Sequence, residues 1–94
     1  MKIVWTEAAL GQLVSIRNFI AENSESNAAL VAARILETIQ LLESRPEIGR
    51  PGEVPGTREL AIPRTPYVLV YRVLDGGLRL LAIFHGRQQR PTSL

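Results

Sequence analysis

The hydrophobic periodicity of this chain changes once, and that change constrains the fold more than any other feature. Apolar residues recur at helical spacing up to residue 44, and they alternate with a period of two from residue 57 onward. Between the two regions lies RPEIGRPGEVPG at residues 45–56, with three prolines and three glycines. Neither side is large enough to hold a core of its own, so this segment predicts a loop inside one domain that spans residues 1–94.

The first half predicts a helical hairpin. Thr6 is a suitable N-cap, and a first apolar stripe follows it up to Ile20. Residues 23–26 form a polar break, after which Ser26 or Asn27 can cap a second helix. Pro46 ends this helix, because the residue before a proline avoids the helical conformation. Two helices joined by a short break predict an antiparallel pair.

Four segments predict strands: residues 2–5, 57–62, 67–74 and 78–85. The turns between the last three lie at residues 63–66 and 75–77. The order β-α-α-β-β-β predicts an α+β fold, in which the helical hairpin covers one face of a mostly antiparallel four-stranded sheet. Residues 86–94 form a polar C-terminal tail.

Strict alternation predicts which side chains of the last strand face the helices. The more apolar set should face them: Leu78, Leu80, Ala82 and Phe84. The opposite, open face should then carry Arg79, Leu81, Ile83 and His85. We expect Arg72 of the preceding strand to share this open face with His85.

Composition narrows the class of function. Residues 1–47 hold four basic and six acidic groups, whereas residues 48–94 hold seven basic and three acidic groups, and ten of the eleven basic residues are arginine. A basic C-terminal half suggests an acidic or nucleic-acid partner, although arginine also serves simply to solvate a surface. With no cysteine and a single histidine we expect no metal site and no cofactor. No apolar run approaches a membrane span, so we expect a soluble cytoplasmic protein without membrane contact.

One group of residues could carry chemistry. Cleavage of RNA needs a proton acceptor, a proton donor and cations beside the phosphate, which His85 and arginines can supply. The residues available for this are the single histidine and the arginines of the second half: Arg58, Arg64, Arg72, Arg79, Arg87 and Arg90, with His85. Structural alternatives stand beside this hypothesis: a hydrogen-bonded strand-end residue for His85, a cross-strand ion pair for Arg58, and an ion pair or a packed side-chain stem for Arg72. The chain has no glycine-rich phosphate loop and no recognisable Ser-His-Asp set.

Four segments together resemble the RelE/ParE superfamily of bacterial toxins. They are WTEAAL at 5–10, RPEIGRPG at 45–52, GTRELAIPRTPYVLVYRV at 56–73 and LLAIFHGRQQRP at 80–91. The resemblance covers nearly the whole chain, is greatest to the ParE branch, and implies the same β-α-α-β-β-β fold.

The resemblance also implies a function. Such proteins are the toxins of type II toxin–antitoxin modules, and a ParD-like antitoxin with a ribbon-helix-helix segment neutralises them and carries the complex to operator DNA. ParE-like members inhibit DNA gyrase without chemistry of their own, whereas RelE-like members cut mRNA in the ribosome. This chain has no lysine after Lys2 and no tyrosine in its tail, so the resemblance favours the gyrase inhibitor. The ribosome-dependent endonuclease remains the alternative. The resemblance to RelE-like members then implies Arg58, Arg64, His85 and Arg87 as its catalytic residues.

Two surfaces are expected on such a toxin. The helices carry more apolar residues than one sheet face can bury, and Leu30, Val31 and Leu41 lie off the main stripe, so we expect them to bind an amphipathic helix of the antitoxin. For the target we expect a basic surface made of Arg72, His85, Arg87 and Arg90.

Overall fold

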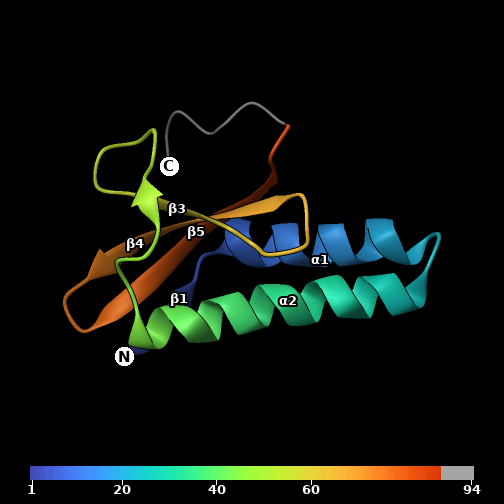
Figure 1. The fold of residues 1–94 in the computed structure, drawn as a ribbon, viewed down its shortest axis with the longest axis horizontal. Helices are drawn as coiled ribbons and strands as arrows, with labels where there is room; N and C mark the ends of the chain where they lie inside the picture. Colours follow the sequence, from blue (N-terminus) through green and yellow to red (C-terminus); the bar gives the residue numbers. More distant parts are fainter. Residues whose placement is uncertain (88–94) are drawn as a thin grey trace.

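In a computed structural model, which describes residues 1–87, a helical hairpin packs on one face of a five-stranded sheet (Figure 1). The elements are β1 Lys2–Trp5, α1 Glu7–Ala21, α2 Glu25–Ser44, β2 Arg50–Pro51, β3 Arg58–Ala61, β4 Tyr67–Leu74 and β5 Gly77–His85. The strand order is β1-β5-β4-β3-β2, with β1 parallel to β5 and the other neighbours antiparallel. The predicted α+β fold is therefore confirmed.

The sheet has one strand more than predicted. Arg50 and Pro51 form β2 and pair with Glu59 and Arg58 at the edge of the sheet. Two residues give no measurable alternation, and the proline at an edge position is typical of loops as well as of edge strands. The composition of residues 45–56 therefore concealed this strand.

Side-chain caps define where the helices begin. Thr6 caps α1 as predicted, because its Oγ1 accepts a hydrogen bond from the Ala9 N–H at 3.1 Å. The cap of α2 is Ser24, whose Oγ accepts from the Asn27 N–H at 3.1 Å. The predicted cap at Ser26 or Asn27 is wrong, because Ser24 already has the extended backbone of a cap residue and leaves a shorter linker.

The main core lies between the helices and the sheet. Buried residues from α1, α2 and the central strands form it together: Ala9, Ile35, Ile39, Leu42, Ile62, Tyr67, Leu69, Tyr71, Leu78, Leu80 and Ile83. A smaller cluster of Val70, Ala82 and Phe84 lies apart from it. We call the sheet face that carries this smaller cluster the outer face.

A β-bulge in β5 changes which side chains face the helices. Val70 pairs with Ala82 but Tyr71 pairs with Leu80, so Leu81 is an extra residue on β5. Leu78 and Leu80 face the helices as predicted. Beyond the bulge the alternation is reversed, and Ile83 joins the main core whereas Ala82 and Phe84 join the outer cluster.

The predicted open face is therefore wrong for half of the strand. His85 pairs with Tyr67 and lies on the helix side of the sheet. Arg72 pairs with Arg79 on the outer face, so it does not share a face with His85. No helix within residues 1–87 is long and apolar enough to cross a membrane.

Candidate functional site

Arg58 is engaged in holding a loop. Its Nη1 donates hydrogen bonds to the carbonyl oxygens of Glu47 at 3.2 Å and Gly49 at 2.8 Å. Its backbone pairs with Tyr71 across β3 and β4. The cross-strand ion pair considered for Arg58 is absent among residues 1–87, because its guanidinium binds main-chain carbonyls instead.

The same loop is held a second time, by Tyr71. Its hydroxyl donates to the Pro46 carbonyl at 2.8 Å and accepts from the Gly49 N–H at 2.9 Å. The side chain is fully buried, and this burial raises the pKa of the Tyr71 hydroxyl above its ordinary value. Together, Tyr71 and Arg58 fix residues 46–49 and leave Ile48 exposed at the surface.

Arg64 lies in the turn between β3 and β4, with a left-handed backbone at φ 61°. Its carbonyl oxygen accepts a hydrogen bond from Arg34 Nη1 of α2 at 2.9 Å. Arg34, Arg64 and Leu41 belong to a hollow of about 180 Å³ between α2 and this turn.

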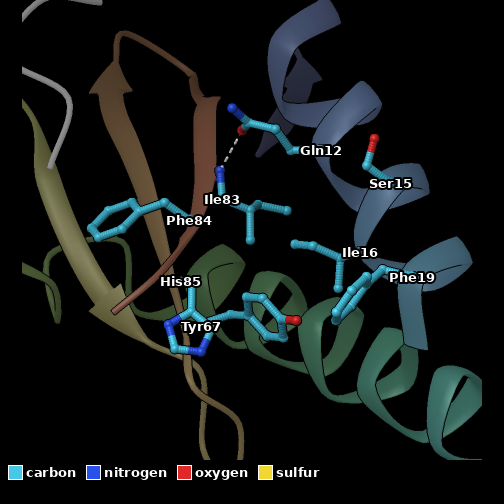
Figure 2. Close-up of a pocket in the computed structure, with 8 residues that line it drawn as sticks. All are labelled: Gln12, Ser15, Ile16, Phe19, Tyr67, Ile83, Phe84 and His85. Atoms are coloured by element: carbon cyan, nitrogen blue, oxygen red, sulfur yellow. Dashed lines mark hydrogen bonds between the residues drawn. The ribbon is translucent and has the colours of Figure 1, made fainter. Parts of the chain in front are cut away.

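His85 lines a larger hollow of about 500 Å³ between α1 and the end of β5 (Figure 2). Its ring meets that of Tyr67 edge to face, with centroids 5.7 Å apart. The Arg87 N–H donates to His85 Nδ1 at 3.1 Å, which requires that nitrogen to be unprotonated. His85 is therefore a hydrogen-bonded strand-end residue, as the structural alternative predicted.

The β-bulge at Leu81 places Ile83 and His85 on the helix side of the sheet, where they line this hollow. Ile83 points into it, and the Ile83 N–H at the strand edge donates to Gln12 Oε1 of α1 at 2.7 Å. The Thr6 hydroxyl donates to the carbonyls of Leu80 and Leu81 on the same edge. Phe19 forms part of the wall and is 67% exposed. Sequence reasoning missed this hollow, because strict alternation had placed Ile83 and His85 on the opposite face.

The predicted target-binding residues are separated. Arg72 lies on the outer face, His85 on the helix side, and Arg87 is exposed directly after β5. Arg90 lies outside the described residues. An outer-face ion pair joins Arg50 to the buried carboxylate of Glu59 at 3.3 Å.

The residues expected to bind an antitoxin differ in exposure. Leu30 and Leu41 are 46% and 44% exposed on α2. Val31 is partly buried and packs against the main core. Further exposed apolar side chains are found on both helices: Leu10, Val14, Phe19 and Leu36.

Comparison with known proteins identifies the family. Residues 3–90 match the family described as the ParE toxin of the type II toxin–antitoxin system parDE. The chain belongs to the ParE toxin family. It is 37% identical over 93 residues to a putative toxin, Y4kP, of Sinorhizobium fredii, covering 99% of this chain and 96% of the relative. It is also 33% identical over 84 residues to toxin RelE2 of Caulobacter vibrioides, covering 89% and 93%.

A solved structure agrees with this assignment. A chain of the chromosomal ParDE toxin–antitoxin system from P. aeruginosa superposes on this ParE-family fold with a TM-score of 0.80. The two are 28% identical, and the match covers 90% of this chain and 95% of the other. The chain is thus the toxin component of a type II toxin–antitoxin system.

Proposed function

We propose that this toxin arrests growth by poisoning DNA gyrase. Membership of the ParE family is the observation that carries the proposal. The positions of the candidate ribonuclease residues support it as well: His85 and Arg87 are neighbours at the end of β5, whereas the guanidinium of Arg58 binds loop carbonyls. Arg64 lies beside α2, and His85 Nδ1 accepts a main-chain hydrogen bond. General acid–base catalysis needs such groups around one reacting atom.

We further propose that a ParD-like antitoxin with a ribbon-helix-helix segment neutralises the toxin in the cytoplasm and carries it to operator DNA. The matching structure is that of a ParDE toxin–antitoxin system, which supports such a partner. Leu30 and Leu41 are eleven residues apart, which is three helical turns, so they lie on one side of α2. The hollow beside Leu41 offers room for an apolar side chain of an antitoxin helix.

The test distinguishes a toxin that inhibits replication from one that inhibits translation. The toxin is induced in a bacterial host while DNA synthesis, DNA-damage induction and protein synthesis are followed. Purified gyrase is then assayed with the toxin for cleaved DNA. We expect halted DNA synthesis, DNA-damage induction and accumulation of gyrase-cleaved DNA. Early translation arrest with cut mRNA, and an unaffected gyrase, would contradict the proposal in favour of the endoribonuclease.

A further inference from the structure

Three basic side chains form a line across the outer face of the sheet. Lys2 and Val4 of β1 lie beside Gly77 and Arg79 of β5, and Arg79 lies directly opposite Arg72 of β4. Lys2, Arg79 and Arg72 thus occupy one face of three adjacent strands, over roughly 10 Å given the usual strand spacing. We call these three residues the cation row.

Arg72 and Arg79 of the cation row are like charges at directly opposite positions of paired strands. Like charges directly opposite each other on paired strands are destabilising. The ion pairs found among residues 1–87 join Arg17 to Glu25 and Arg50 to Glu59, and neither includes a member of the row. Asp75 of the nearby turn borders the same shallow hollow as Lys2 and Arg79, but it lies beyond ion-pair distance of both.

The backbone makes room for this arrangement. The guanidinium of Arg72 extends over Gly56, where a Cβ would collide with Nη1. Gly56 also has a left-handed backbone, with φ 83°, which other residues rarely adopt. Arg72 therefore extends toward the loop before β3, on the side of β4 away from β5, and this spreads the positive charges of the row across the face.

The surroundings of the row favour a protein over a nucleic acid. Val4 and Leu74 lie on the same face and are exposed, so cationic and apolar groups alternate. Carboxylates beside apolar side chains would complement both kinds of group, and arginine matches carboxylates well. Single-stranded nucleic acids are usually held by exposed aromatic side chains, and none lines this part of the face.

We propose that the cation row docks an acidic, partly apolar segment of the toxin's protein target. The proposal deepens the proposed function, because it assigns the target to the outer face, whereas the antitoxin is assigned to the helices. It does not require the target to be gyrase.

The test uses the full-length toxin with Arg72→Gln and Arg79→Gln together. The control, Arg17→Gln with Arg45→Gln, removes the same charge from exposed positions at the helices. Toxicity is scored as the inducer level that halts growth, and antitoxin affinity is measured on the purified proteins. We expect the outer-face variant to need at least tenfold more inducer but to bind antitoxin normally, whereas the control should match the wild type in toxicity. Circular dichroism confirms folding.

A second arm uses defined probes with the wild-type toxin. An alternating Glu-Leu peptide and a 12-base-pair DNA duplex are titrated while the arginine Nε resonances are followed by NMR. We expect the peptide to shift Arg72 and Arg79 and the duplex to leave them unchanged. If the wild-type chain does not arrest growth, this second arm alone tests whether the cation row binds an acidic, partly apolar segment.

Each contrary result has one meaning. Unchanged toxicity of the outer-face variant overturns the inference, as does a shift with the duplex alone. A parallel loss of antitoxin affinity would assign the row to the antitoxin and overturn the target assignment. Loss of toxicity together with translation arrest by the wild type would contradict gyrase poisoning but leave the cation row as the target surface.

Discussion

The Tyr71 hydroxyl occupies the space that a side chain at residue 49 would need. A Cβ on Gly49 would lie 2.6 Å from this oxygen, which instead accepts the Gly49 N–H hydrogen bond. Glycine at position 49 and tyrosine at position 71 therefore depend on each other, and the loop after α2 is fixed through this contact.

Replacing Tyr71 by Phe should destabilise the fold. The Gly49 N–H and the Pro46 carbonyl would lose their partner in a buried site, which costs about 1–3 kcal/mol. Urea unfolding measures the change. Tyr67→Phe is the matched control, because no hydrogen bond of the Tyr67 hydroxyl is found among residues 1–87, and it should cost much less. Equal losses in both variants would contradict a stabilising role for the two hydrogen bonds of the Tyr71 hydroxyl.

The same hydroxyl makes the free energy of unfolding decrease at alkaline pH. Burial raises the pKa of Tyr71 in the folded state, so folding favours the neutral phenol. This contribution is fully present below the pKa of an unfolded tyrosine, about 10, and is lost as pH rises through the higher folded pKa. The difference in unfolding free energy between wild type and Tyr71→Phe should therefore shrink above about pH 10. A constant difference from pH 8 to 11 would disprove the linkage.

Because Leu81 is the extra residue of the bulge, we expect the fold to tolerate its deletion. Removing Leu81 leaves the pairs Tyr71–Leu80 and Val70–Ala82 consecutive, so every other side chain of β5 keeps its face. We expect the Leu81 deletion to fold, at a cost of about 1–3 kcal/mol from lost packing. Deleting Ile83 instead would move the following side chains to the other face and should abolish cooperative unfolding. Thermal denaturation distinguishes the two deletions.

Local signals predicted most of the fold, and long-range contacts explain what they missed. Thr6, Pro46 and the Asp75-Gly76 turn act within a few residues, so the start of α1, the end of α2 and the end of β4 were predicted correctly, although β5 begins at Gly77, one residue earlier than predicted. The bulge at Leu81 depends on how β5 pairs with both neighbours, and no residue type marks it. The contacts of Tyr71 and Arg58 with residues 46–49 join segments 9 to 25 residues apart. The hydrophobic periodicity within a segment cannot predict such contacts.

The antitoxin surface on α2 can be tested with matched leucines. Leu41→Glu should weaken antitoxin binding at least tenfold, because it places a charge where an apolar contact is expected. Leu36→Glu is the control, since Leu36 is also exposed but lies on another side of α2. Affinity is measured by calorimetry with the purified antitoxin. Equal losses in the two variants would indicate a general effect on α2.

The last prediction concerns the end of β5, where Arg87 follows His85. Arg87 is exposed, and no hydrogen bond or ion pair of its side chain is found among residues 1–87, so Arg87→Ala should leave stability unchanged. Because Arg87 belongs to the expected target surface, the same change should lower toxicity at least tenfold. His85→Ala should reduce toxicity less, because gyrase poisoning requires no proton transfer. His85→Asn tests positioning, since an amide oxygen can still accept the Arg87 N–H. Growth arrest and antitoxin affinity are measured for all three. If both His85 variants remove toxicity while folding and antitoxin binding persist, acid–base chemistry at His85 becomes the better explanation.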